Sequence, residues 1–313
     1  MGTSGLIDVH HHFLPERYAE ALRRSGNDRP DGVAAIPQWS EKEAIDLLDG
    51  AHIEKAYLSI SSPGVLLDGC DAADLARIVN DEAAELVGRR SGRFGGFASL
   101  PLPDVESSLR ELTRAFDTLG LDGVVLLTHY HDTYLGDPAL DPVFDELNRR
   151  DAVVFLHPTS PVCWACTALG LPRPGIEFMF DTTRAVTNLI FSGTIDRCPR
   201  ISWIVPHAGA ALPVLASRID MLRLMASECC QASEPVAEYL SRFYYDLAGP
   251  RTDDALRALL GIAQPSRLLY GSDWPFTPGP FVTHLLANLT HSGVFTAGQL
   301  EAVMSGNARR LLG

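Results

Sequence analysis

The feature that most constrains the fold of this chain is a rhythm of eight short apolar runs separated by longer segments. The runs are near-continuous in apolar residues, which is typical of strands buried on both faces in a parallel sheet. They are Leu6–His10, Lys55–Ile60, Phe94–Ser99, Gly123–Thr128, Val153–His157, Ile201–Val205, Phe243–Leu247 and Arg267–Tyr270. Between them, apolar residues recur at i, i+3 and i+4, as in amphipathic helices. These segments are Glu41–Leu48, Ala72–Gly88, Val105–Leu119, Pro138–Arg150, Thr182–Ser192 and Asp253–Leu260.

A strand followed by a helix, repeated eight times, predicts a closed (β/α)₈ barrel. The 313 residues suit one such domain, so we expect residues 1–313 to form a single domain. A doubly wound open sheet is the alternative, but the chain has no GxGxxG or Walker-type glycine fingerprint to favour it. Asn27–Ser40 and Ser160–Phe180 fall outside the repeat, and we expect both at the C-terminal mouth, where βα loops build sites.

Composition narrows the classes of partner. With 46% hydrophobic and 21% charged residues the chain is globular, and its net charge of −13 disfavours nucleic acid and anionic membranes. No apolar stretch approaches the roughly 20 residues of a membrane span, and Met1–Leu6 lacks the pattern of a signal peptide. We therefore expect a cytoplasmic protein with reduced thiols among its six cysteines. The single CxxC motif, Cys163–Cys166, is a weak zinc or redox signal, because no suitable second pair accompanies it.

Polar residues gather where the predicted strands end. Side chains alternate along a strand, so His10 and His12 point the same way and His11 points the other way. Two imidazoles on one side of a strand end favour metal binding. His157, His207 and Asp273 follow the fifth, sixth and eighth runs, which places all five on the face where barrel enzymes hold their sites. One such histidine is often only a hydrogen-bonded loop residue, but the joint pattern predicts a metal site.

A second His-x-His sequence competes with the first. His129 and His131 follow the fourth run. They could belong to the site or to a polar loop, and His131 is the better candidate for a substrate contact.

Several stretches together resemble one family. They are Ile7–Pro15, Phe155–Pro158, Ile204–Gly209, Leu269–Phe276 and the tail Gly306–Leu312. The chain resembles the amidohydrolase superfamily, in the branch of aminocarboxymuconate semialdehyde decarboxylase. Within that branch Pro37–Ser40, Ser61–Gly64 and Glu177–Gly193 look most like 6-methylsalicylate decarboxylases.

The resemblance implies roles for the strand-end residues. His10, His12, His157 and Asp273 match the metal ligands, and His207 matches the histidine that contacts substrate or activates water. No lysine stands after the fourth strand, where binuclear relatives carry a carboxylated one, which favours a single divalent ion. Three nitrogens and a carboxylate suit Zn²⁺, and Mn²⁺ is the alternative.

Two reactions fit these residues. In the first, a metal-dependent decarboxylase acts on a hydroxylated aromatic acid such as 6-methylsalicylate, with Asp273 carrying a proton to the ring and His207 assisting. In the second, a metal-dependent hydrolase of an amide or lactone uses the same site, with Asp273 taking a proton from water. A non-catalytic metal-binding barrel is a third class, but it would leave His207 without a role.

The pocket separates the two reactions, because decarboxylation calls for a dry, aromatic site. Aromatic residues in the predicted mouth loops favour it; they are Trp39, Trp164, Phe178, Phe180, Trp274 and Phe276. We expect substrate contacts from Trp39, Phe276 and His131. Arg184 could pair with a carboxylate through its guanidinium, or could be a surface helix residue. We also expect a homo-oligomer, a dimer or a tetramer.

Overall fold

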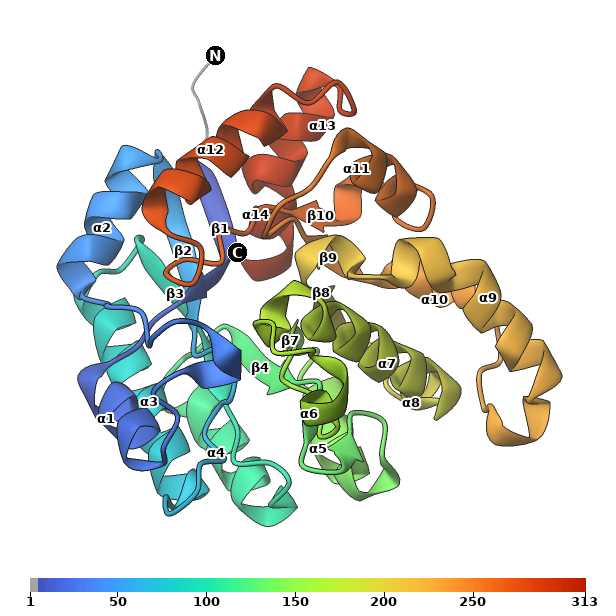
Figure 1. The fold of residues 1–313 in the computed structure, drawn as a ribbon, viewed down its shortest axis with the longest axis horizontal. Coiled ribbons are helices and arrows are strands. Elements are labelled where there is room, and N and C mark those ends of the chain that lie inside the picture. Colours follow the sequence, from blue (N-terminus) through green and yellow to red (C-terminus); the bar gives the residue numbers. More distant parts are fainter. Residues whose placement is uncertain (1–4) are drawn as a thin grey trace.

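The computed structural model, which describes residues 5–313, contains one eight-stranded parallel sheet with helices around it (Figure 1). Each strand pairs with the next along the chain, in the order that a (β/α)₈ barrel requires. The strands are β1 Leu6–His12, β2 Ile53–Ser59, β3 Phe94–Ser99, β4 Gly123–Leu127, β7 Val153–His157, β8 Ser202–Val205, β9 Tyr244–Asp246 and β10 Leu268–Leu269. The barrel predicted from the eight apolar runs is confirmed.

The sheet closes on itself through backbone bonds between β1 and the segment that follows β10. The Val9 amide donates to the Tyr270 carbonyl at 3.0 Å, and the His12 amide donates to the Trp274 carbonyl at 2.7 Å. The Asp273 amide donates to the His10 carbonyl at 2.8 Å. The last strand, β10, therefore pairs with β9 over only two residues. The segment that follows it forms the backbone hydrogen bonds that close the barrel against β1.

The helices lie outside the strands (Figure 1). They are α1 Glu16–Arg24, α2 Glu41–Gly50, α3 Ala72–Arg89, α4 Val105–Asp117, α5 Asp141–Arg149, α6 Trp164–Thr167, α7 Glu177–Phe191, α8 Thr194–Arg197, α9 Leu212–Met225, α10 Val236–Arg242, α11 Asp253–Leu260, α12 Gly279–Thr290, α13 Ala297–Glu301 and α14 Asn307–Leu312. No helix in the described range is long and apolar enough to cross a membrane.

Most predicted strands and helices agree with the structure to within two residues. The predicted helix Pro138–Arg150 begins with a 3₁₀ turn, η2 (Pro138–Leu140), before α5. The fifth predicted helix segment, Thr182–Ser192, is the C-terminal part of α7, which begins at Glu177. The mouth segment Ser160–Phe180 therefore ends inside a helix. The segment after β4 is also more ordered than expected, because β5 (His129–Tyr130) and β6 (Thr133–Tyr134) form a small antiparallel hairpin.

Two groups of buried residues make the core. One lies inside the barrel, where Val9, Phe97 and Phe155 pack together and Ala308 of α14 closes the N-terminal end. The larger group lies between the strands and the helices and includes Leu48 of α2, Leu112 of α4 and Leu189 of α7. Burial on both faces explains why the strands are apolar almost throughout. Polar side chains are left at the C-terminal ends of the strands.

Candidate metal centre and active site

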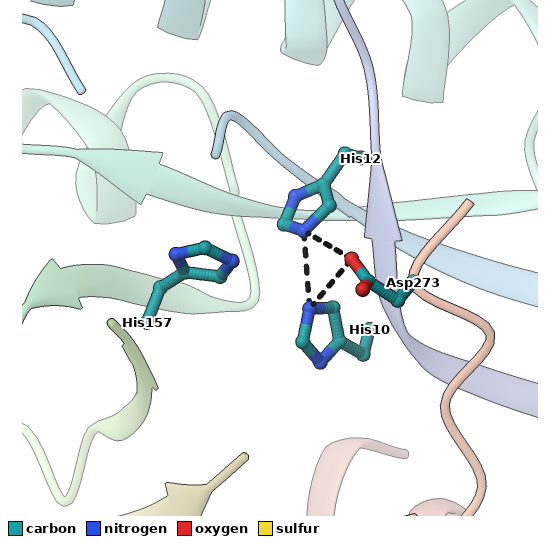
Figure 2. Close-up of side chains that lie close together, drawn as sticks. All are labelled: His10, His12, His157 and Asp273. Atoms are coloured by element: carbon teal, nitrogen blue, oxygen red, sulfur yellow. Dashed lines mark hydrogen bonds and ion pairs between the residues drawn. The ribbon is translucent and has the colours of Figure 1, made fainter. Parts of the chain in front are cut away.

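Three histidines and one aspartate meet at the C-terminal end of the barrel (Figure 2). One donor atom from each of His10, His12, His157 and Asp273 lies within 4.8 Å of all the others. The Nε2 atoms of His10 and His12 are 3.0 Å apart. Oδ1 of Asp273 is 3.4 Å from the first of these nitrogens and 3.2 Å from the second. Among the described residues, this is the cluster that could hold a metal ion.

The first two ligands share β1, where the pairing with β2 shifts register between Asp8 and His11. His10 and His12 point into the cluster (Figure 2). His11 makes its contacts elsewhere, as side-chain alternation predicts. The His11 Nδ1 lies 3.0 Å from the Asp8 carboxylate, and its ring packs on Trp274 at 5.0 Å. His11 is therefore a packing residue.

Each ligand histidine is oriented by an acceptor at its other ring nitrogen. Nδ1 of His10 lies 2.9 Å from Oδ2 of Asp246, Nδ1 of His12 lies 3.2 Å from the Ser59 carbonyl, and Nδ1 of His157 lies 2.8 Å from the Pro158 carbonyl. These acceptors place a proton on every Nδ1, so Nε2 is the ring nitrogen that each histidine offers to a metal ion. This tautomer is the one that a metal ion requires.

The electrostatics of the cluster favour a positive charge in its middle. Burial lowers the pKa of His12, and burial together with the neighbouring histidines places the pKa of His157 well below its usual value. Burial also lowers the pKa of His10, but the Asp246 and Asp273 carboxylates reverse that shift and raise it to about 10. Without an ion, a proton on His10 therefore provides the positive charge beside Asp273, while His12 and His157 are neutral.

This arrangement fits one divalent ion. The raised pKa of His10 places a proton in the 3.0 Å contact between its Nε2 and Nε2 of His12, and a divalent ion would displace that proton and bind both nitrogens. Burial raises the pKa of Asp273, but hydrogen bonds with His10, His12 and His207 outweigh burial and hold the pKa well below its usual value. The fourth donor is therefore an anion.

His207 stands beside the ligand cluster. Its Nε2 is 3.8 Å from Oδ2 of Asp273, the oxygen that does not face His10 and His12. It sits in η4 (His207–Gly209) with a left-handed φ of 54°, and its backbone amide donates to Oδ1 of Asp246 at 3.0 Å. Within residues 5–313, its buried Nδ1 has no hydrogen-bond partner. No acceptor fixes the tautomer of this imidazole, so it can either donate or accept a proton.

A cavity of about 440 Å³ opens over the cluster, a volume within the usual range for small-molecule sites. His157, His207 and Asp273 line it on one side. Most of the remaining wall is apolar and comes from the mouth loops and the segments after β9 and β10. The residues are Pro30, Val33, Pro174, Gly175, Phe178, Met179, Ala248, Gly249, Pro250 and Phe276, with Asp31, Ser61 and Thr277 as the polar exceptions.

The four predicted substrate contacts separate in the structure. Phe276 lines the cavity, with its ring 5.5 Å from that of His12. Trp39 instead packs edge-on against Phe13 at 6.0 Å, beside the core. Among the described residues, those that line the cavity do not include Trp39, His131 or Arg184.

His131 and Arg184 are held elsewhere by their own contacts. His131 lies at the tip of the β5–β6 turn and lines a separate pocket of about 270 Å³. Arg184 lies on the outer side of α7, with its side chain 54% exposed and its Nη1 3.4 Å from Oδ1 of Asp181. This position favours the interpretation of Arg184 as a surface helix residue over a role in pairing with a substrate carboxylate. Cys163 and Cys166 are exposed free thiols at the start of α6.

Sequence reasoning missed three charged residues around the site. Asp246 orients His10, but it lies inside the apolar run Phe243–Leu247, which predicts only a strand. A carboxylate near the end of a buried strand is the signal that could have identified it. Asp31 lines the cavity from η1 (Pro30–Gly32), inside a segment read only as loop. Arg251 follows β9, and its Nε and Nη2 are buried without a partner among the described residues. No periodic pattern marks Asp31 and Arg251, which lie outside the strands.

Comparison with known proteins agrees with this geometry. The model of the family described as Amidohydrolase matches residues 7–313. A decarboxylase from Aspergillus niger is 40% identical, over 87% of this chain and 77% of that protein. A 6-methylsalicylic acid decarboxylase from Penicillium expansum is 38% identical, over 87% of this chain and 85% of that protein. A solved dihydroxybenzoic acid decarboxylase from Polaromonas sp. JS666, with bound manganese and the inhibitor 2-nitroresorcinol, superposes with a TM-score of 0.85 at 25% identity, over 98% of this chain and 96% of that one.

Proposed function

The chain belongs to the amidohydrolase family, as its motifs predicted, and from that premise we propose that it decarboxylates a hydroxylated aromatic acid with one bound divalent metal ion. The observation that carries the proposal is a ligand cluster at one side of a largely apolar cavity. A planar ring suits such walls, and an apolar site excludes the water that hydrolysis would need. Named decarboxylases among its relatives, at 38–40% identity, support the same reaction.

His10, His12, His157 and Asp273 would hold the ion. When bound, it would supply Lewis-acid stabilisation of negative charge on a phenolate or carboxylate oxygen of the substrate. Phe276 and Phe178 flank the space where the ring would lie and keep water from it.

The proton in this reaction comes from the chain. Asp273, which is an anion in the free site, would first take up a proton from solvent and then deliver it to the ring carbon that carries the carboxylate, which interrupts the aromatic system. The bond to the carboxyl carbon then breaks, carbon dioxide leaves, and its bonding electrons return to the ring. His207, 3.8 Å from Oδ2 of Asp273, would hold the substrate oxygen or pass a solvent proton to Asp273.

The test is incubation with a panel of salicylates in deuterated water, beginning with 6-methylsalicylate. We expect release of carbon dioxide and a phenol that carries one deuterium at the carbon that lost its carboxylate. Deuterium enters there because Asp273 exchanges its proton with solvent. Cleavage of amides or lactones, with every salicylate left intact, would show that the same residues run hydrolysis instead.

The identity of the ion is a separate proposal. Three imidazole nitrogens and one carboxylate match the ligand preferences of zinc, so we infer Zn²⁺, although the Polaromonas structure contains manganese. Elemental analysis of the purified protein should find about one zinc per chain. One manganese per chain would replace zinc, and two ions per chain would contradict the mononuclear site.

We further infer a single domain that assembles into a homo-oligomer. One sheet runs from Leu6 to Leu269 and α14 returns to contact β1, which supports a single domain. On α9, Val214, Met221 and Met225 expose 61–79% of their surface, and exposed apolar side chains on one helix favour a partner. Sedimentation velocity should give a dimer or a tetramer; a monomer at micromolar concentration would contradict the inference.

A further inference from the structure

One hydroxyl group in the cavity wall lies directly beside the ligand cluster. Ser61 lines the cavity together with His157 and Asp273, and only 7% of its surface is exposed. Its Oγ is 3.5 Å from Nε2 of His157, the ring nitrogen that this histidine offers to a metal ion. The proposed reaction gives Ser61 no part, although its hydroxyl is this close to the reacting centre.

The direction of the hydrogen bond between Ser61 and His157 follows from the tautomer of the histidine. Nδ1 of His157 donates to the Pro158 carbonyl at 2.8 Å, so the neutral ring carries its proton on that nitrogen. Nε2 is therefore the acceptor, and the Ser61 hydroxyl is the donor. Within residues 5–313, the Ser61 hydroxyl has no other hydrogen-bond partner.

The turn after β2 fixes the position of Ser61. The Gly64 amide donates to the Ser61 carbonyl at 3.0 Å, and the Tyr18 hydroxyl donates to the Gly64 carbonyl at 3.0 Å. Gly64 has a φ of 75°, and a Cβ atom there would lie 2.8 Å from Cδ1 of Leu127, so the turn requires glycine. The backbone thus holds Ser61 at the cluster, while its hydroxyl hydrogen can still rotate.

A bound ion would take away the acceptor of this hydroxyl. The ion would occupy the Nε2 lone pair of His157, and it would repel a hydroxyl hydrogen that points toward it. The Ser61 hydroxyl would then turn into a largely apolar cavity from which the substrate ring displaces water. A buried hydroxyl without a partner is costly, so an acceptor on the substrate would restore what the ion removes.

From this geometry we propose that Ser61 is a substrate-binding residue whose hydroxyl donates a hydrogen bond to the anionic substrate oxygen beside the ion. The inference rests on the proposed function and deepens it by naming a donor for the bound acid. A phenolate and a carboxylate oxygen share the required chemistry, and a charged acceptor strengthens the bond. His157 lies across the cluster from Asp273 (Figure 2), so this contact would hold the substrate from the side opposite the proton carrier.

The experiment measures binding of non-reactive anions to zinc-loaded wild type and Ser61→Ala by calorimetry. In 3-methyl-2-nitrophenol a nitro group replaces the carboxylate of 6-methylsalicylate, so no carbon dioxide can leave. Its affinity should fall about tenfold or more in Ser61→Ala, because a hydrogen bond to a charged oxygen is lost. 2-Methylbenzoate offers only a carboxylate and 4-nitrophenolate only a phenolate oxygen, so the one that loses affinity identifies the oxygen that Ser61 contacts.

Ser62→Ala is the matched control. It removes the neighbouring buried hydroxyl, which is 2.7 Å from Oγ1 of Thr159, and Ser62 is not among the described residues that line the cavity. This variant should bind all three anions within about twofold of wild type. The same loss of affinity in both serine variants would mean that the turn, and not the Ser61 hydroxyl, is responsible, and would overturn the inference.

Metal affinity separates the proposed contact from two other roles of Ser61. Competition with a chelator, using Zn²⁺ and no added anion, should give the same affinity in Ser61→Ala and in wild type. A tenfold loss would make Ser61 a ligand or a support for His157, and would contradict the inference. So would equal anion affinities in Ser61→Ala and wild type, or a wild type that binds none of the three anions. Weaker anion binding with unchanged metal affinity would support the inference even if no acid were decarboxylated.

Discussion

The ligand cluster and the mouth loops are built in opposite ways, although both face one cavity. His10, His12 and His157 lie on strands, have almost no exposed surface, and are each fixed by a second hydrogen bond. The opposite wall comes from short turns such as η1 and η3 (Arg173–Gly175), and the segment between α6 and η3 exposes large apolar side chains, including Leu169 at 85%. Chemistry that tolerates little displacement is thus on rigid elements, and substrate shape is read by segments that can vary without unfolding the barrel.

The largest expected effect tests the ligand cluster. Asp273→Asn keeps the side-chain shape but removes the proton carrier and one anionic ligand, so kcat should fall roughly 10³-fold or more. Single-turnover assays with saturating metal measure the loss at the chemical step. Activity within tenfold of wild type would show that another group supplies the proton.

Next in size is His207→Ala, which should lower kcat about 10²-fold while the ion stays bound. The reason is geometric, because His207 lies beside the cluster and its contact with Asp273 is 3.8 Å. His157→Ala is the matched control, since it removes a ligand and should release the ion. Elemental analysis of both variants decides the point: loss of the ion from His207→Ala would make that histidine a ligand.

A smaller effect is expected for a residue that contacts a ligand histidine without being a ligand itself. Asp246→Asn should weaken metal affinity about 10- to 100-fold, because the Asp246 carboxylate orients His10 and keeps it electron-rich. Competition with a chelator measures the affinity. Asp122→Asn is the control, since Asp122 is a largely buried carboxylate before β4 that accepts the Gly96 amide at 2.8 Å and should leave metal affinity unchanged. Equal effects of the two would mean that Asp246 only stabilises the fold.

The same contrast explains how far the sequence could predict this molecule. Strand periodicity and the position of strand ends were enough to bring His10, His12, His157, His207 and Asp273 together, because the barrel leaves no other place for them. Even the outward direction of His11 follows from alternation along β1.

Loop residues escaped prediction because tertiary contacts decide their direction. Trp39 looked like a pocket residue by type, yet it packs on Phe13. Asp31 looked like loop polarity, yet a left-handed turn and Ser160 place it in the cavity wall. Asp246 was hidden inside an apolar run, where composition gives no hint that its partner is His10, 236 residues away.

The smallest expected effect concerns the two sequence-predicted contacts that lie outside the cavity. His131 has a left-handed φ of 52°, so His131→Asn is the variant that removes the imidazole without straining the turn. Arg184→Gln removes an exposed guanidinium whose ion pair with Asp181 contributes little in water. Each variant should keep kcat/KM within about twofold of wild type, as surface changes generally do. Phe276→Leu, which alters a ring that does line the cavity, should raise KM several-fold and shows that the assay detects a lost contact. A tenfold loss of kcat/KM in His131→Asn would mean that the β5–β6 hairpin contacts bound substrate. The contrast drawn here, in which this hairpin lies outside the site, would then be wrong.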